Sequence, residues 1–281
     1  MKIIDGRKLS LEILENIKHE VAGLLFVPVF CDVLVGKDPA SLQYVGMKSK
    51  KAESVGIKFH SANFPESITT PELILEIIKL NNIENMCGII VQLPLPEHID
   101  RRAVLDAIDP NLDVDCLGTM ASEKFYNNEN GSGSPLGFPT ALACMALLDS
   151  LNLDLENRKI LVLGQGALVG KPVTSLLRFR GVHVDTLSRA TENKEELIKN
   201  ADVIISGLGQ GKYLTGDMVK DGVVIIDAGT SEENGSIVGD VDFESVKDKA
   251  SFLTPTPGGV GPVTVAMLLN NVLYVAKNMI K

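Results

Sequence analysis

Apolar and polar residues alternate along this chain in blocks whose lengths predict helices and strands in turn. Apolar residues recur near helical spacing over residues 11–24, and the apolar run at residues 27–35 is typical of a buried strand. Asp38-Pro39 then predicts a helix start, because Asp caps helices and Pro fits their first position. The pattern continues with strands near residues 57–62 and 87–91 and a helix that starts at Pro71.

Strands that alternate with helices of this length predict a parallel sheet. Ligands of such sheets sit beyond the carboxyl ends of the strands. Gln92 directly follows the strand at residues 87–91, so it lies where a binding site is expected. The plainer alternative is that the Gln92 amide only satisfies a backbone group at the end of that strand.

The second half of the chain predicts a Rossmann-like unit. It has a strand at residues 160–163, a tight turn at Gly164-Gln165-Gly166, a helix over 167–180, and strands at 182–187, 203–206 and 223–227. An apolar helix opens at Pro139 and runs through residue 151. The last apolar helix, within residues 262–281, can pack against either domain.

We therefore predict an α/β protein of two domains, residues 1–120 with a parallel sheet and residues 121–281 with a Rossmann-like fold. The polar Gly/Ser-rich stretch at residues 127–134 is typical of a mobile connection.

Composition narrows the class of protein. The 281 residues, 45% hydrophobic and 22% charged, suit one large or two modest globular domains. A net charge of −9 argues against nucleic acid or an anionic membrane as the main partner. The chain starts without an apolar signal core and has no unbroken apolar run of roughly 18 residues, so we expect a cytoplasmic protein. Its four Cys and four His residues lack ligand spacing, and we expect neither disulfide nor metal.

Tyr44 and Lys48 are four residues apart on a predicted helix and therefore share one face. Such a pair is a known proton-handling device, although an arbitrary pair of this spacing is more often a solvated helix face. In short-chain dehydrogenases the same pair follows the Gly-rich turn of the nucleotide site, whereas here it precedes that turn by more than a hundred residues. The architecture is therefore a different one.

The segment Gly164-Gln165-Gly166-Ala167-Leu168-Val169-Gly170 resembles a dinucleotide-binding turn, one residue longer than the commonest form. The alternative is a tight turn without a ligand. Asp185 lies inside the next strand, and Ser188-Arg189 at its end suits a 2′-phosphate, which favours NADP over NAD. A solvated surface charge is the alternative for Arg189.

Four motifs carry a resemblance to a known family: YVxxKxK at residues 44–50, VQLPLP at 91–96, DVD at 113–115 and PGGVGPVT at 257–264. In this order they resemble the bifunctional methylenetetrahydrofolate dehydrogenase/cyclohydrolases over nearly the full length. That resemblance implies NADP-dependent oxidation of 5,10-methylenetetrahydrofolate, with NAD possible, and hydrolysis of the product to 10-formyltetrahydrofolate. It also implies a cytosolic homodimer that serves one-carbon metabolism and purine biosynthesis.

The resemblance assigns the site residue by residue. Lys48 matches the catalytic lysine, Tyr44 the tyrosine that stacks on folate, Gln92 the glutamine that holds the lysine, and Asp115 the carboxylate that grips the pterin. The remaining implied substrate-binding residues are Leu93, Pro94, Pro257, Gly258 and Gly259. The implied cofactor-binding residues are Gly164, Gln165, Gly166, Val169, Gly170, Ser188, Arg189 and Thr230.

The departures from the family pattern lie mostly on the cofactor side. Gln165 and Gly166 replace a usual arginine and serine, so a cyclohydrolase with weak dehydrogenase activity is one alternative function. A two-domain dehydrogenase of the shikimate or malate type is a second, and a non-catalytic folate- or nucleotide-binding protein is a third. A protein that only binds these ligands would not need Lys48.

Overall fold

A computed structural model describes residues 1–127, 136–233 and 235–279, and the chain within it forms two compact units. We call them the three-stranded unit (described residues 12–127, 136–139 and 265–279) and the six-stranded unit (described residues 1–11 and 140–264). Of the predicted connection at residues 127–134, only Asn127 lies within the described residues.

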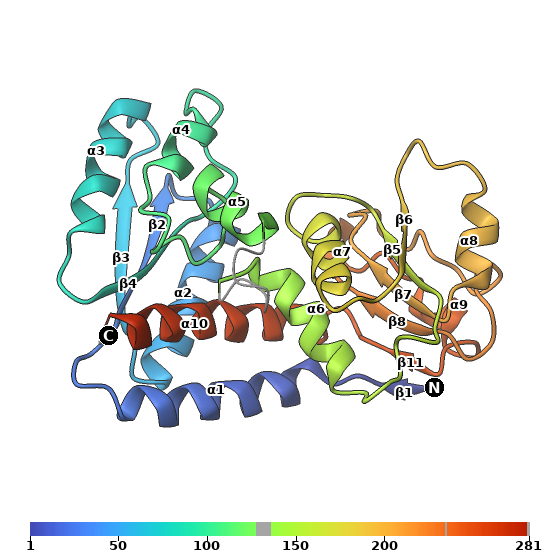
Figure 1. Ribbon diagram of the computed structural model, residues 1–281. Helices are drawn as coiled ribbons and strands as arrows, with labels where there is room; N and C mark the ends of the chain where they lie inside the picture. The colour runs from blue at the N-terminus through green and yellow to red at the C-terminus, as the bar shows by residue number, and fades with distance from the viewer. Residues whose placement is uncertain (128–135, 234, 280–281) are drawn as a thin grey trace. The chain divides into compact units, whose positions relative to one another are not determined.

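The three-stranded unit has a parallel sheet in the order β3-β2-β4 (Figure 1). Its strands are β2 (Val29–Val35), β3 (Lys58–Phe64) and β4 (Met86–Val91). Its helices are α2 (Pro39–Ser54), α3 (Thr70–Asn81), α4 (Arg101–Asp106) and α5 (Thr119–Asn127), with most of α1 (Gly6–Ala22) and α10 (Val260–Asn278). The alternation predicted from the sequence is therefore present.

Both faces of this sheet are covered, because side chains of a strand point alternately to opposite faces. On β2, Val29, Cys31, Val33 and Val35 pack in one apolar cluster with α3 and α4. Phe30 packs in a second cluster with α1, α2 and α10. Even positions of β2 thus face α2.

The six-stranded unit is a parallel sheet in the order β1-β11-β8-β7-β5-β6. Its strands are β1 (Lys2–Ile3), β5 (Ile160–Leu163), β6 (Val184–Leu187), β7 (Val203–Ser206), β8 (Val224–Asp227) and β11 (Phe252–Leu253). Its helices are α6 (Pro139–Asp149), α7 (Gly170–Phe179), α8 (Lys194–Asn200) and α9 (Phe243–Val246), and β9 (Ser231–Glu233) pairs with β10 (Ser236–Val238). From β5 the chain adds β6 on one side and then crosses to add β7 on the other side. The order of the strands thus reverses between β5 and β7, which is the switch point where such sheets bind ligands.

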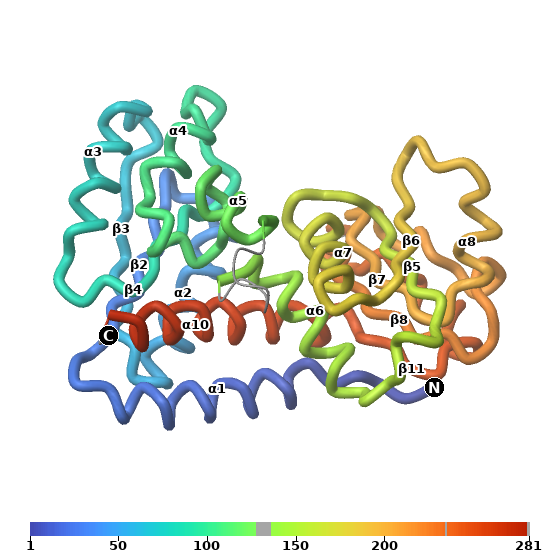
Figure 2. The backbone as a smooth tube through the Cα atoms, in the orientation of Figure 1, coloured from blue at the N-terminus to red at the C-terminus, as the bar shows by residue number. Residues whose placement is uncertain are grey.

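The tube drawing in Figure 2 follows the chain through each unit. The contacts divide the chain at other residues than the prediction does. The first eleven residues join the six-stranded unit through β1, and the chain from residue 265 joins the three-stranded unit. One cut near residue 120 therefore does not describe these contacts. The helix predicted over residues 167–180 begins only at Gly170.

The sequence leaves two packings open for the last helix, and the structure shows it packed within the three-stranded unit. Ala266, Leu269, Val272 and Ala276 of α10 lie in the same apolar cluster as Phe30 of β2. By length and composition α10 is also apolar enough to cross a membrane, with a mean hydropathy of 1.3. Its packing identifies it as a core helix instead.

Asn271 fastens α10 to the loop segments around it. Its side chain is fully buried, and its Nδ2 donates to the carbonyl oxygens of Val114 and Gly137, each at 2.8 Å. We expect Asn271→Ala to lower the free energy of unfolding by about 2–4 kcal/mol, because two buried carbonyl groups lose their donor. Urea unfolding measures this, with the exposed Asn278→Ala as the matched control. A loss no larger than that of the control would contradict the role of Asn271.

Candidate active site

Helix α2 carries Lys48 into the interior of the three-stranded unit. Asp38 caps the helix by accepting from the Ser41 N–H at 2.8 Å, and Pro39 is its first residue, so the predicted helix start is confirmed. The buried residues of α2 recur at helical spacing: Ser41, Val45, Lys48 and Ala52. Lys48 therefore belongs to the buried stripe of the helix and not to a solvated face.

Tyr44, one turn before Lys48, is 45% exposed. The phenol ring and the ammonium thus differ strongly in their surroundings although they are four residues apart. The exposed ring leaves a flat apolar surface accessible to a ligand, which suits the stacking role that the resemblance implies.

The Lys48 side chain ends between two acceptors. Its Nζ donates to Gln92 Oε1 at 2.8 Å and lies 2.7 Å from Asp32 Oδ2. Gln92 is held at the end of β4, where its backbone N–H donates to Val33 O at 2.8 Å. The structure therefore brings the predicted pair Lys48 and Gln92 into direct contact.

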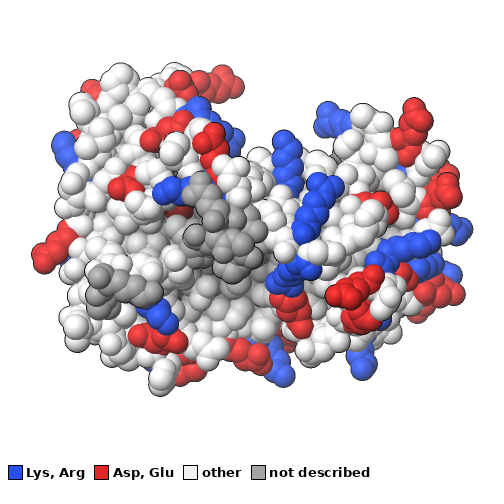
Figure 3. Space-filling model, in the orientation of Figure 1, with Lys and Arg blue, Asp and Glu red and all other residues white. Residues whose placement is uncertain are grey.

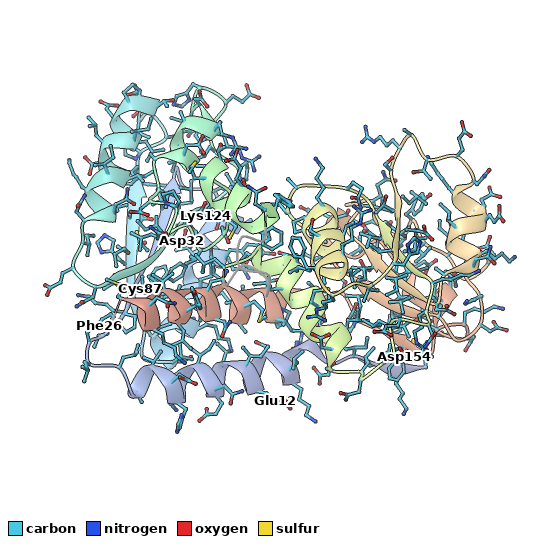
Figure 4. The ribbon with its side chains drawn as sticks, in the orientation of Figure 1. Glu12, Phe26, Asp32, Cys87, Lys124 and Asp154 are labelled. Carbon is cyan, nitrogen blue, oxygen red and sulfur yellow. The ribbon has the colours of Figure 1, made fainter. Side chains whose placement is uncertain are left out.

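Asp32 is the site residue that sequence reasoning missed. It lies on β2 inside the three-stranded unit (Figure 4), with none of its surface exposed. Burial raises the pKa of Asp32, and the Lys48 ammonium works against that rise. The signal was present in the sequence, because a carboxylate in the middle of the apolar strand VFCDVLV needs a partner.

The segment Asp113-Val114-Asp115 runs beside β4, where Ile89 N donates to Leu112 O at 2.8 Å and Ile89 bridges to Asp113. Asp113 is buried and accepts from the Gly118 N–H at 2.7 Å, so it shapes this loop. Asp115 remains partly exposed. Burial raises the pKa of Asp115 to about 7, and the nearby charges act on it as well: Lys48 lowers it, while Asp113 and Asp32 raise it further.

The Gly-rich turn after β5 is shaped in part by packing. Gly164 has φ +84°, and a Cβ there would lie 2.7 Å from Gly207 O. A Cβ on Gly170 would lie 2.0 Å from Gly164 O, so this position also excludes side chains. Gly166 differs, because a Cβ there would meet nothing within 4 Å. Two of the three glycines are explained by the fold, and the space beside the third is open.

The remaining residues assigned to the cofactor lie around this turn and at the ends of neighbouring strands. Gln165 Nε2 donates to Gly164 O at 2.8 Å and to Thr174 Oγ1 at 3.3 Å, so its amide is engaged within its own turn. Ser188 N donates to Thr191 Oγ1 at 2.9 Å after β6. Arg189 is exposed beside them, and Val169 precedes α7 and Thr230 follows β8.

Sequence reasoning also missed a second cation near the end of β6. Lys194, the first residue of α8, donates from Nζ to Arg189 O at 3.0 Å. The Lys194 ammonium therefore lies against the Arg189 backbone, next to the end of β6.

The Pro-Gly run before α10 belongs to the six-stranded unit. Gly258 has φ +112°, and a Cβ on Gly259 would lie 2.6 Å from Pro255 O. The positive φ of Gly258 and the close backbone approach at Gly259 thus account for both glycines, as a rigid loop requires. Pro257 is exposed, whereas Leu93 and Pro94 follow Gln92 in the three-stranded unit, partly buried and exposed respectively.

Comparison with known proteins settles the family. The model of the tetrahydrofolate dehydrogenase/cyclohydrolase catalytic domain matches residues 4–115, and that of the NAD(P)-binding domain of the same family matches residues 139–280. The chain belongs to this family. The bifunctional protein FolD of Nautilia profundicola is 42% identical over 285 residues, covering 100% of this chain and 99% of the relative.

Solved structures of this family agree over the whole chain. The bifunctional FolD methylenetetrahydrofolate dehydrogenase/cyclohydrolase of Campylobacter jejuni has a TM-score of 0.93 and 38% identity, covering 99% of each chain. The enzyme of Trypanosoma brucei, complexed with NADP cofactor and an inhibitor, has a TM-score of 0.92 and 34% identity, covering 100% of this chain and 99% of that one. A shikimate 5-dehydrogenase of Thermus thermophilus, at 15% identity and a TM-score of 0.50, shares the fold alone.

The ion pair of Lys48 and Asp32 predicts how the free energy of unfolding changes when one or both charges are removed. Lys48→Met leaves the Asp32 carboxylate buried without a cation, and we expect it to lower the free energy of unfolding by about 3–5 kcal/mol near neutral pH. The double variant Lys48→Met/Asp32→Val removes both charges and should recover most of that loss. Urea unfolding of the two single variants and the double variant measures the cycle.

The loss in Lys48→Met should also shrink as the pH falls. The pKa of Asp32 is raised in the folded protein, so lowering the pH protonates the buried carboxyl and removes the unpaired charge. A double variant as unstable as Lys48→Met, or a loss that grows in acid, would contradict a buried ion pair.

Proposed function

We propose that this protein oxidises 5,10-methylenetetrahydrofolate with NADP and hydrolyses the resulting 5,10-methenyl form to 10-formyltetrahydrofolate. The observation that carries the proposal is the contact of Lys48 with Gln92 at the end of β4, with Asp115 on the adjacent loop, in a chain of this family. Curated relatives over the full length are named bifunctional proteins, which supports two activities in one chain.

The chemistry of hydrolysis requires a water molecule to be delivered to the electrophilic methenyl carbon. A lysine amine can accept the proton of that water, and the Gln92 amide fixes the direction of the Lys48 side chain. Asp115 supplies a carboxylate that can accept N–H hydrogen bonds from a pterin edge, which orients the ring. The exposed ring of Tyr44 provides a stacking surface.

The six-stranded unit fits a dinucleotide. The open space beside Gly166, in the turn that precedes α7, lets a phosphate approach the backbone, and the switch point of the sheet lies at the same turn. Arg189 and Lys194 supply positive charge for a 2′-phosphate. NADP supplies the hydride acceptor for the oxidation. The engaged Gln165 amide offers no cation, which favours weak NADP binding and hence a modest dehydrogenase activity.

The biological setting is also a proposal. We infer a cytoplasmic homodimer that works on tetrahydrofolate derivatives in one-carbon metabolism and supplies purine biosynthesis, without nucleic acid or membrane partners. The net charge of −9 supports the part of this proposal that concerns nucleic acid and membranes. The mixing of acidic and basic side chains on the face drawn in Figure 3 supports it too. A shikimate-type activity has only a shared fold in its favour, and a purely binding function leaves the buried Lys48 unexplained.

A matched pair of variants tests the hydrolytic site. Lys48→Met should reduce methenyltetrahydrofolate hydrolysis by about 100-fold or more while folate binding survives, because it removes a positioned proton-transfer group.

Asp115→Ala should weaken folate binding in both reactions by roughly 10- to 150-fold, the effect of one lost charge-assisted pair. Methenyl absorbance follows both reactions.

The double variant Lys48→Met/Asp32→Val serves as the folded control for the first variant. Hydrolysis by Lys48→Met above about one percent of the wild-type rate would remove Lys48 from the mechanism. A loss in only one reaction for Asp115→Ala would make Asp115 a group of that reaction and not a pterin anchor.

The cofactor site generates a further prediction. Arg189→Ala should erase most of a mild NADP preference and leave kcat/KM for NAD nearly unchanged, because Arg189 is expected to meet only the 2′-phosphate. Lys194→Ala, which removes the second cation, is the matched comparison. The specificity constants for both cofactors are measured in each variant. If neither variant alters the preference, or if the wild type prefers NADP by more than about a thousandfold (roughly 4 kcal/mol), the 2′-phosphate is bound elsewhere.

A further inference from the structure

The proposed hydrolysis assigns a base to Lys48, but the structure gives this side chain a carboxylate partner. With Asp32 ionised 2.7 Å away, Lys48 is held as an ammonium. An ammonium has three N–H donors and no lone pair, so it cannot accept a proton from water. Lys48 must first lose a proton, and the structure shows where that proton can go.

Asp32 is the acceptor in direct contact with Lys48 that can take a proton. Gln92, the other contact of Nζ, is a neutral amide and holds no extra proton. Among the described residues, Asp32 Oδ1 has no hydrogen-bond donor, and the residue has no exposed surface. A carboxylate so poorly solvated gains more from protonation than one in water.

We propose that Asp32 accepts the proton of Lys48 during hydrolysis, so that the two residues act together as one base. This inference rests on the hydrolytic function proposed above. Asp32 does not reach the substrate; it acts through Lys48 and is a positioning residue.

The proton transfers balance. A Lys48 Nζ–H bond breaks and an Asp32 Oδ2–H bond forms, which leaves a neutral amine beside a neutral acid. The amine then takes a proton from water as the water oxygen bonds to the methenyl carbon, and the positive charge of the substrate is neutralised. The new ammonium can give a proton to the departing folate nitrogen. When the hydroxyl proton of the adduct is released to solvent, Asp32 returns its proton to Lys48, and one proton leaves per turnover.

The arriving substrate favours the first transfer. The methenyl group is a cation, and placing it near a second cation raises the energy of the Lys48 ammonium. Transfer of one proton over 2.7 Å to Asp32 removes that repulsion. A site that held Lys48 by hydrogen bonds to neutral groups alone would have to release the proton to solvent.

The other titratable groups near the pair act differently. Asp115 is partly exposed, and its pKa is raised to about 7, so it titrates in the free protein. Asp113 is committed to the Gly118 N–H, and the thiol of Cys31, next to Asp32 on β2, has a pKa raised to about 12 by burial. Because Asp115 affects folate binding, the test uses kcat at saturating folate.

The pH profile of the wild-type protein is the first test. If the pair is the base, the active form persists once Asp32 is ionised, so kcat for hydrolysis should reach a plateau and stay flat through the alkaline range after subtraction of the uncatalysed rate. It should fall only in acid, at a pH above the ordinary carboxyl value of about 4, because burial raises the pKa of Asp32. A kcat that rises about tenfold per pH unit through the alkaline range would overturn the proposal, since Lys48 would then release its proton to solvent.

Asp32→Asn is the second test. It keeps the shape of the side chain and removes the proton acceptor, so kcat near neutral pH should fall by about 10- to 100-fold and acquire the rising alkaline limb that the wild type lacks. KM for the methenyl substrate should change less than about threefold, because Asp32 is fully buried. Asp106→Asn makes the same exchange at an exposed carboxylate of the same unit and should keep the wild-type profile.

The outcomes are distinct. An Asp32→Asn variant with an unchanged profile, or one as fast as the wild type, would show that Asp32 only balances charge. Thermal unfolding reports whether this variant folds. If it does not fold, the pH profile of the wild type decides the question: a flat alkaline limb supports the proposal and a rising limb overturns it. If the wild-type protein hydrolyses no methenyltetrahydrofolate at any pH, the proposed function itself fails. That result differs from a failure of the Asp32 proposal, in which the enzyme is active but has the wrong pH profile.

Discussion

The burial of one ammonium and one carboxylate within an apolar sheet unit constrains much of this protein. Taking each ion out of water costs several kcal/mol, and only close mutual contact offsets that cost. Lys48 and Asp32 meet at 2.7 Å, and removing either one would leave the other charge buried without a partner. The pair therefore ties α2 to β2, together with the apolar packing of Ala52 and Phe30, and directs the Lys48 amine toward Asp32.

The parallel sheet supplies the rest of the three-stranded site. Gln92 leaves β4 at its carboxyl end, and the DVD segment runs alongside the same strand, so an amide and a carboxylate reach the neighbourhood of Lys48 from different parts of the chain. Asn271 of α10 holds the backbone of that segment from a position 157 residues further along. Two carboxylates near one lysine, Asp32 and Asp115, make a site in which small changes of protonation alter the charge presented to a ligand.

In the Gly-rich turn, packing within the protein requires some of the glycines, and only one is left for binding a ligand. Gly164 and Gly170 are required because their Cβ atoms would strike backbone oxygens, whether or not a nucleotide is bound. Gly166 has no such neighbour. The part of the motif that points to a ligand is thus a single open position together with its place at the switch point of the sheet.

The sequence by itself determined the alternation of strands and helices, the helix start at Asp38-Pro39, the parallel sheets and the family, because periodicity, capping and long motifs are local signals. It paired Lys48 with Gln92 only through the resemblance.

Only the tertiary structure decided that residues 1–11 belong to the six-stranded unit and that the last helix packs in the three-stranded unit. It also decided that Lys194 lies beside Arg189 and that Asp32 faces Lys48. Each of these is a contact across the fold, and its energy comes from two elements being brought together. The pattern of either element alone does not specify such a contact, because a strand with one buried Asp reports that a partner exists and not which residue it is.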